Sequence, residues 1–511
     1  MSRSLFASYF AEKVRMSPSL GSYLGDRRRD SHVEDALSPT MLDASYQLCM
    51  KYDTLLRAKK DKGHKLSIED LTLAWEIKMG LESHQYPLEQ LTMNSFHNIV
   101  IEMAFTESQL YSKPCESRVI DYIAILRTTI YNMKAGICNK VVLPKCICEK
   151  LLLSLHSFMK SSSVIKGTES IIMEIIAFLQ KEYLPACRDT IGLCDLPKGR
   201  AMYRHLIRSQ TSTNMTPEAI HAYGLKEVAR IEAAFRHIQG VLGRSKRESL
   251  SHFYKWAMNQ KDQYCSNDAE VMKMYKATQK RIRETIWKDN FDYALKTDYH
   301  IKKVAKEMED TSAGAFYMPS SYKPGEFEGT FYVNMRDLKE NPKYNMYTLS
   351  LHEGFHHYQY QYMIENRIPS YMIYGISNNA YSEGIALYAE GLGIYDDPME
   401  EFGHLVNDMM RAARLVVDTG IHWYGWSWKK TLDYMMEHVP LSHTEIETEL
   451  ERYICYPAQA LCYSIGRKVF TDLRDAYLKE HPGDIKGYHH FILEDGVLPL
   501  DVLKEKIYSV L

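Results

Sequence analysis

Apolar side chains recur every three or four residues along much of this chain, which is the spacing of one buried helical face. In the stretch 42–56 they are Leu42, Tyr46, Cys49, Tyr52 and Leu56. Only 17 prolines and 26 glycines are spread over 511 residues, so long helices are seldom interrupted. The sequence therefore predicts a large, mainly α protein.

One stretch departs from this helical spacing. Between Tyr317 and Met335 lie Pro319, Ser320, Ser321, Pro324, Gly325 and Gly329, and the alternating residues 330–334 follow. Turns that lead into a short β element are expected there. A second cluster of prolines and glycines, at 184–199, suggests a boundary, and we expect an N-terminal helical lobe (1–195) packed on a second lobe (196–511).

Composition excludes several classes of partner. Lys and Arg total 63 and Asp and Glu total 65, so no net basic charge marks a surface for nucleic acid or anionic membrane. The apolar stretch 171–179 is broken by Glu174 and is far short of the ~20 residues that cross a bilayer. Since no export signal is evident, we expect a cytoplasmic protein.

The ten cysteines are scattered along the chain, and reduced thiols are expected. The tightest group is Cys138, Cys146 and Cys148, whose spacing is not that of a structural zinc site.

The most informative motif is H-E-x-x-H, formed by His352, Glu353 and His356. Residues four apart share one face of a helix, so both imidazoles can reach one metal ion while Glu353 flanks it. Zinc accepts imidazole nitrogen, and a catalytic zinc site commonly has three protein ligands. The motif predicts one zinc ion.

A second helix-like segment, 382–390, offers the third ligand. Glu383 follows His356 by 27 residues, enough for a turn through Pro369 and a returning helix, and is the expected ligand. Glu390 can instead accept a hydrogen bond from a ligating histidine. The alternative is a solvated helix with two surface glutamates.

The chain resembles a family catalogued as domain of unknown function 885, described as zincin-like and as containing peptidases. The segments that carry the resemblance, in order, are Ser17–Asp26, Gly199–Tyr203, Thr216–Leu225, Gly329–Asn334, the H-E-x-x-H motif, Glu383–Glu390, Leu415–His422, Tyr456–Tyr463 and Gly496–Leu500. The resemblance implies a zinc peptidase. The array is also similar to thimet oligopeptidase, angiotensin-converting enzyme and carboxypeptidase Taq, in which a downstream glutamate completes the metal shell.

The chain departs from the family at one point. The family has a Pro-Gly pair in a longer H-E-x-x-P-G-H-H-x-Q form, whereas Phe355 is followed directly by His356 and His357. The spacing of His352 and His356 favours an intact site, with His357 as the alternative ligand. Loss of the site is the other interpretation.

For catalysis, Glu353 is the expected general base. Tyr463 and His422 are candidate donors to an oxyanion, and Asp418, four residues before His422, can orient it on a helix. For both candidates a hydrogen-bonded core position is the alternative.

Arg452 and Tyr453 are candidate ligands for a substrate carboxylate, with surface pairing as the alternative. The sequence thus predicts a zinc-dependent metallopeptidase that cleaves short peptides. A metal-dependent amidohydrolase acting on a non-peptide amide and a metal-free helical scaffold or binding protein are the competing hypotheses.

Overall fold

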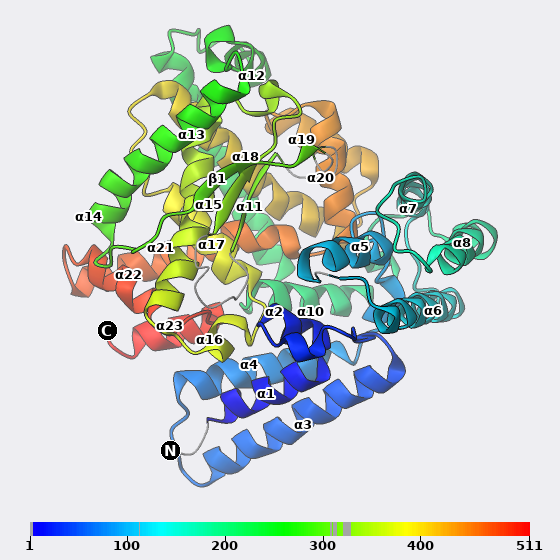
Figure 1. Ribbon diagram of the computed structural model, residues 1–511. Helices are drawn as coiled ribbons and strands as arrows, with labels where there is room; N and C mark the ends of the chain where they lie inside the picture. Colours follow the sequence, from blue (N-terminus) through cyan, green and yellow to red (C-terminus); the bar gives the residue numbers. More distant parts are fainter. Residues whose placement is uncertain (1–3, 112, 307–308, 310–313, 320–328) are drawn as a thin grey trace. The chain divides into compact units, whose positions relative to one another are not determined.

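The computed structural model describes residues 4–111, 113–306, 309, 314–319 and 329–511. These residues form a mainly α-helical protein with one small sheet, which confirms the predicted fold class (Figure 1). The chain divides into two compact units. The first comprises Met1–Ser209, Asp418–Leu432 and Thr444–Ala458, and the second Gln210–Val417, Asp433–His443 and Gln459–Leu511. Both units are discontinuous in sequence, whereas the lobes expected from composition, 1–195 and 196–511, are contiguous.

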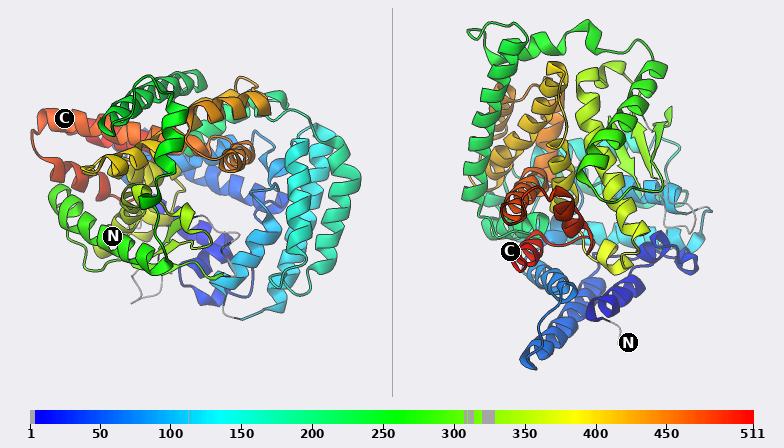
Figure 2. Two further views of the ribbon diagram at one scale, coloured as in Figure 1. Left: turned by 90° about the horizontal axis from the view of Figure 1, so that it is seen from above. Right: turned by 90° about the vertical axis from the view of Figure 1, so that its left-hand side faces the viewer.

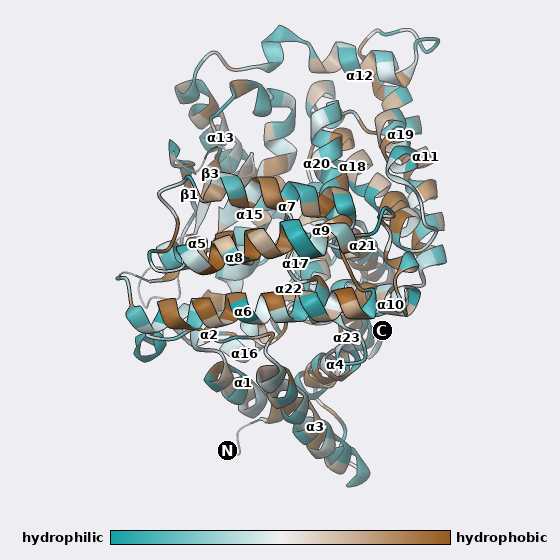
Figure 3. Ribbon diagram, turned by 90° about the vertical axis from the view of Figure 1, so that its right-hand side faces the viewer, coloured by the Kyte–Doolittle hydropathy of each residue, from teal (hydrophilic) through white to brown (hydrophobic). Residues whose placement is uncertain are grey.

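Amphipathic helices make up the first unit, and Figure 3 shows apolar and polar residues alternating along α6 and α7. Its helices are α1 (Leu5–Met16), α2 (Pro18–Tyr23), α3 (Pro39–Asp61), α4 (Ile68–Ser83), α5 (Ile99–Leu110), α6 (Glu116–Asn139), α7 (Lys145–Phe158), α8 (Glu169–Phe178), α9 (Leu184–Ala186), α10 (Gly199–Thr211) and α20 (His443–Cys455). The stripe predicted in 42–56 lies on α3, where Cys49, Tyr52 and Leu56 are buried.

The second unit holds the sheet and the remaining helices. α18 (Pro398–His422) and α19 (Trp428–His438) contribute residues to both units, as do the end of α10 and the first residue of α20. Its own helices are α11 (Pro217–Val241), α12 (Leu250–Met258), α13 (Asp268–Ile282), α14 (Lys288–Asn290), α15 (Lys343–Glu365), α16 (Ser370–Tyr374), α17 (Asn379–Glu390), α21 (Cys462–Glu480), α22 (Ile485–Leu493) and α23 (Leu500–Tyr508). The first of them begins as its sequence indicates, because the Thr216 hydroxyl caps α11 and Pro217 occupies the first turn.

The sheet has the strand order β1-β3-β2, formed by β1 (His300–Lys303), β2 (Ala315–Met318) and β3 (Thr330–Val333). β3 is the predicted short strand, and it pairs in parallel with β1 and antiparallel with β2. The expected turn residues Ser320, Ser321, Pro324 and Gly325 lie outside the described residues. The sheet lies beside α15 (Figure 2), so that β2 packs against that helix.

A close approach of two helices positions the centre of the second unit. A Cβ atom added to Gly384 of α17 would lie 2.4 Å from the Cα atom of Gly466 of α21, so both positions require glycine. α17 also packs against α15, which places these helices side by side.

Among the residues that the structure describes, no helix is both long and apolar enough to cross a membrane. The cytoplasmic location expected from the sequence stays a prediction.

Candidate metal centre

α15 presents the H-E-x-x-H motif from a largely buried helix. The helix starts directly after Pro342, which occupies the position before the first turn. His352 and His356 share one face, with ring centroids 4.9 Å apart. His352 is buried and His356 is partly exposed, so one side of the pair remains accessible.

α17 brings Glu383 to the same place. Its first turn is capped by the Asn378 side chain, which accepts a hydrogen bond from the Tyr381 amide. The expected reversal passes through Pro369 and α16, and the contact between Gly384 and Gly466 seats α17 in the core. The predicted ligand therefore comes from a returning helix.

The three predicted ligands converge. Glu383 Oε2 lies 3.2 Å from His352 Nε2 and 3.6 Å from His356 Nε2, and ligand atoms of all three lie within 4.8 Å of one another. Two ligand atoms at zinc–nitrogen or zinc–oxygen distance from one tetrahedral ion would be roughly 3.4 Å apart. The described part of the chain holds no other group of three or more His, Cys, Asp or Glu residues this compact.

The hydrogen-bond partners of the two His352 ring nitrogens are also consistent with a bound cation. Its Nδ1 lies 2.8 Å from Glu390 Oε1, so a neutral imidazole donates its single N–H to Glu390. The lone pair on Nε2 then faces the Glu383 carboxylate, and two electron-rich atoms at 3.2 Å require a proton or a metal ion between them.

Electrostatic interactions among these residues also favour a positive charge at the site. Burial lowers the pKa of His352, but hydrogen bonds to Glu383 and Glu390 outweigh it and raise that pKa to about 9. Burial raises the pKa of Glu383, yet hydrogen bonds from His352 and His356 bring it well below its usual range. The site holds Glu383 as a carboxylate and favours positive charge beside it.

His357 points elsewhere. It is buried, its Nδ1 lies 3.2 Å from the Tyr317 hydroxyl, and its Nε2 lies 3.3 Å from the Thr297 carbonyl oxygen. Both ring nitrogens thus have partners away from Glu383. The structure brings His356 and not His357 to the candidate site.

Glu353 lies on the face of α15 that meets the sheet. Its Oε2 accepts a hydrogen bond of 2.9 Å from the Tyr317 amide of β2, and among the described residues its Oε1 has no hydrogen-bond partner. The Tyr317 ring passes over Gly329, where an added Cβ would lie 1.9 Å from the tyrosine hydroxyl. Glu353 is thus fixed through one oxygen only.

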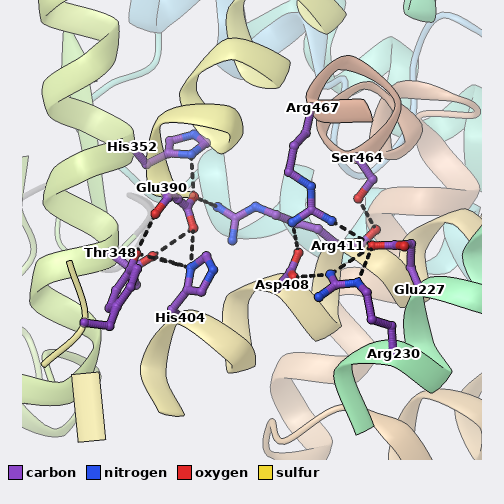
Figure 4. Close-up of polar contacts among 11 residues, drawn as sticks. Glu227, Arg230, Thr348, His352, Glu390, His404, Asp408, Arg411, Ser464 and Arg467 are labelled. Carbon is purple, nitrogen blue, oxygen red and sulfur yellow. Dashed lines mark hydrogen bonds and ion pairs between the residues drawn. The ribbon is translucent and has the colours of Figure 1, made fainter. Parts of the chain in front are cut away.

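Glu390 is fully buried behind His352 (Figure 4). Its Oε1 faces His352 and lies 3.4 Å from Arg411 Nη2. Its Oε2 accepts a hydrogen bond of 2.8 Å from the Thr348 hydroxyl and lies 3.8 Å from His404 Nδ1. Burial raises the pKa of Glu390, and Arg411, His352 and His404 bring it well below its usual range.

The network continues on α18 and α21 (Figure 4). Asp408 is buried and pairs with Arg230 at 2.8 Å and also with Arg467. Both arginines also pair with Glu227, at 2.9 Å and 3.2 Å. Two carboxylates and two guanidinium groups therefore compensate one another, with Arg230 on the exposed side of the cluster.

Sequence reasoning missed the polar residues of α18 that contact Glu390 and Arg467. His404, Asp408 and Arg411 follow one another at spacings of four and three, which places three polar residues on one face of a helix. That face is buried, as the flanking apolar residues indicate. Polar residues on the buried face of an amphipathic helix were the available signal.

Tyr463 belongs to α21 and lies next to the triad. Its ring is nearly parallel to that of His352, at 21°, with the centroids 6.3 Å apart. The guanidinium groups of Arg414 and Arg411 lie 4.9 Å and 5.7 Å from the tyrosine ring centroid. The predicted oxyanion donor therefore remains a candidate.

The other predicted donor, His422, belongs to the first unit and not to the unit of the triad. It is fully buried, its Nδ1 accepts a hydrogen bond from the Leu193 amide, and its Nε2 donates to the Tyr453 carbonyl. Burial lowers its pKa to about 3. His422 is a neutral core residue.

Asp418 does not orient His422. Its carboxyl group accepts hydrogen bonds from the Tyr203 hydroxyl at 2.5 Å and from the Ala458 amide at 3.1 Å. Asp418 and His422 lie one turn apart on α18. However, Tyr203 and Ala458, which come from other segments, form the hydrogen bonds to the Asp418 carboxyl oxygens.

Arg452 and Tyr453, the predicted substrate ligands, also lie in the first unit. Arg452 lies 3.7 Å from the Glu449 carboxylate, and the buried Tyr453 donates a hydrogen bond to the same group. The structure does not group them with the triad. Cys138, Cys146 and Cys148 are free thiols, like the other cysteines.

The comparisons with known proteins agree on the fold. A family model described as "Bacterial protein of unknown function (DUF885)" matches residues 18–507. The crystal structure of a putative lipoprotein from Colwellia psychrerythraea is similar, with a TM-score of 0.82 and 21% identity over 99% of both chains. A putative lipoprotein of unknown function from Shewanella oneidensis has a TM-score of 0.78 and 15% identity, covering 99% of this chain and 100% of its own. No curated protein matches.

Proposed function

Because the chain belongs to the DUF885 family, whose description assigns no activity, we propose its function from the geometry of the site: it is a zinc-dependent hydrolase that cleaves short peptides. The observation that carries the proposal is the convergence of His352, His356 and Glu383 from two helices, at ligand-atom distances of 3.2 Å and 3.6 Å. Two imidazoles and a carboxylate are a donor set of catalytic zinc sites.

A bound zinc ion would lower the pKa of a coordinated water to about 7 and polarise a substrate carbonyl. In this proposal Glu353 takes the proton from that water and passes it to the leaving amine. It directly follows a ligand on α15, and its Oε1 is not engaged by the described residues. The Tyr317 amide holds the other oxygen, which keeps Glu353 oriented.

A peptide substrate is favoured by the strand beside Glu353. Among the described strands, β2 lies at the edge in the order β1-β3-β2, and its Tyr317 amide points away from β3, toward Glu353. Because the Tyr317 amide already donates to Glu353, an extended peptide would align with this edge through the other outward-facing main-chain groups of β2. A peptide laid along β2 would present its carbonyls to the face of α15 that carries Glu353.

Tyr463 is proposed as a donor to the oxygen that becomes negative during attack. Its ring stacks on His352, and two arginines lie over it, so it is well fixed. Tyr463→Phe would keep this packing and remove the hydroxyl. We expect zinc content to be unchanged and kcat to fall about 100-fold.

The decisive experiment combines metal analysis with a peptide panel. Protein purified without chelators should contain close to one zinc per chain, and it should cleave some unblocked or blocked peptides. Glu353→Gln should keep the zinc and lose at least about 100-fold in kcat. Glu383→Ala should lose both the zinc and the peptidase activity. Glu284→Gln, at an exposed glutamate of the same unit, should keep the zinc and the activity.

The competing hypotheses give other outcomes. Hydrolysis of small non-peptide amides without cleavage of any peptide would assign an amidohydrolase. Protein without zinc and without hydrolysis, whose folding is unaffected by His352→Ala, would be a helical scaffold.

A further inference from the structure

The second unit contains a cavity of about 440 Å3 that the proposed hydrolysis does not use. Its wall is formed by parts of α13, α15 and α22 and by residues of the segment 283–299, which includes α14. None of the three metal-site residues lines it. The volume falls within the roughly 300–1,000 Å3 of small-molecule sites.

Aromatic rings build one side of this cavity. Trp287 and Phe291 each lie against Tyr358, with centroid distances of 5.5 Å and 4.6 Å. Trp287 and Phe291 also contact each other edge to face at 5.6 Å. Because the rings hold one another in place, this wall is preformed and favours a planar ring.

The rim of the cavity carries uncompensated positive charge. Lys288, Lys296 and Lys486 line it, and none has a carboxylate within ion-pair distance among the residues that the structure describes. The Lys486 amino group instead donates to the Lys288 carbonyl at 2.9 Å. Three cations without counter-charges favour an anionic ligand.

The two carboxylates in the wall do not cancel this charge. Asp298 is paired with Arg283 at 3.0 Å and accepts a hydrogen bond from Gln279 at 2.8 Å. Asp292 faces the His490 imidazole at 3.4 Å. The surplus on the rim is therefore positive.

The wall also offers a hydrogen-bonding group that no atom of the described residues uses. The Thr297 hydroxyl is buried and has no partner among the described residues, although its residue lines the cavity. The Thr297 carbonyl oxygen is already taken by His357 at 3.3 Å. A buried polar atom without a partner is costly, so a ligand or water that bonds to the hydroxyl gains stability.

We propose that this cavity binds a small aromatic carboxylate. The ring lies against Trp287, Phe291 and Tyr358, and the carboxylate is held by the lysines of the rim. A free aromatic acid and a peptide that ends in an aromatic residue share this chemistry. The proposal does not rest on the hydrolase activity, because the cavity needs no metal ion.

Calorimetric titration of metal-depleted protein tests it with N-acetyl-L-phenylalanine. We expect a Kd of about 1 mM or tighter, as suits a ligand of this size. N-acetyl-L-phenylalaninamide, which lacks the charge, and N-acetyl-L-alanine, which lacks the ring, should each bind at least about tenfold more weakly. If Gly-Gly-Phe binds as well as the probe, the ligand of the cavity is the end of a peptide. If Gly-Gly-Phe does not bind, the ligand is a free aromatic acid.

Two variants locate the binding. Leu295→Trp should fill the cavity and abolish binding, because Leu295 lines it. Lys296→Gln should weaken binding of the acid several-fold and leave the amide unaffected. Lys276→Gln, at an exposed lysine of α13 outside the cavity, is the matched control.

Thermal unfolding of each variant verifies that it is folded. If Leu295→Trp does not fold, the comparison of acid with amide in Lys296→Gln remains decisive. Equal affinity for acid and amide, no binding at about 10 mM probe, or binding unchanged in the folded variants overturns the proposal.

Discussion

His352 Nδ1 lies 2.8 Å from Oε1 of Glu390, a carboxylate that is almost wholly buried. This hydrogen bond leaves the lone pair of His352 on Nε2 and directs it toward Glu383. The second oxygen of Glu390 is held by Thr348, so the carboxylate cannot rotate away. Carboxylates in this position orient ligating imidazoles and strengthen their binding to metal.

Removal of this charge should therefore weaken zinc binding. For Glu390→Gln we expect about 10- to 100-fold lower zinc affinity, measured by competition with a chromophoric chelator. Glu284→Gln, at an exposed glutamate of the same unit, should not change the affinity. Equal affinity in Glu390→Gln and the original protein would contradict the role assigned to Glu390.

The contact between α17 and α21 should not accept a methyl group. In Gly384→Ala the new Cβ would meet the Cα atom of Gly466 at 2.4 Å, so the helices must separate. We expect a loss of about 1–3 kcal/mol in the free energy of unfolding and weaker zinc binding, because Glu383 moves with α17. Denaturant unfolding and metal titration measure the two effects.

Gly240→Ala is the control for this change. Its nearest contact outside the local helix is 3.5 Å away, at the end of a lysine side chain, and the residue is exposed on α11. Because alanine is the better helix former, the free energy of unfolding of Gly240→Ala should equal that of the original protein or exceed it by up to about 1 kcal/mol. If Gly384→Ala behaved like this control, the close approach would not be a constraint.

The buried ion pairs behind the site should respond strongly to loss of one partner. Asp408→Asn removes the buried carboxylate that pairs with the largely buried Arg467 and with the half-exposed Arg230. We expect a loss of about 3–5 kcal/mol in the free energy of unfolding. Asp472→Asn, in an exposed pair with Lys468, should cost less than about 1 kcal/mol. Similar costs for both variants in denaturant unfolding would disprove this prediction.

Asp418 should make the stability of the first unit depend on pH. Burial raises its pKa to about 7, although hydrogen bonds from Tyr203 and Ala458 oppose the shift. Between about pH 4 and pH 7 the unfolded chain releases this proton while the folded chain retains it, so the contribution of Asp418 to stability falls as pH rises. A shift of about three pKa units corresponds to about 4 kcal/mol.

Asp418→Asn tests this linkage because it cannot ionise. The stability of the variant relative to the original protein should increase between pH 4 and pH 7 and then level off. Denaturant unfolding at a series of pH values measures the difference. Asp189→Asn, at an exposed aspartate of the same unit, should show no such increase. A difference independent of pH in Asp418→Asn would mean that the carboxyl group ionises normally in the folded protein.

Local spacing was sufficient for several features of this protein. Helical periodicity predicted α3 with its buried face, and the alternation at Thr330–Val333 predicted β3. The four-residue spacing of His352 and His356 placed both imidazoles on one side of α15, because helix geometry acts within a single turn.

Spacing along one helix was misleading where partners come from other segments. Asp418 and His422 are four residues apart, yet each is bonded to residues far away in sequence, Tyr203 and Leu193 among them. The division into units shows the same limit, since Thr444–Ala458 joins residues of the N-terminal half. Composition near a boundary does not encode contacts formed hundreds of residues away.

Packing in three dimensions also chose among the possibilities that the motif left open. His356 faces Glu383 while His357 turns to Tyr317, although the two are adjacent in sequence, because successive residues of a helix project about 100° apart. Glu383 and Glu390 took different places because Gly384 lets α17 approach α21 and because Thr348 and Arg411 surround Glu390. Residue order specifies the chemistry that each helix carries, whereas the distances between those groups depend on how the helices pack.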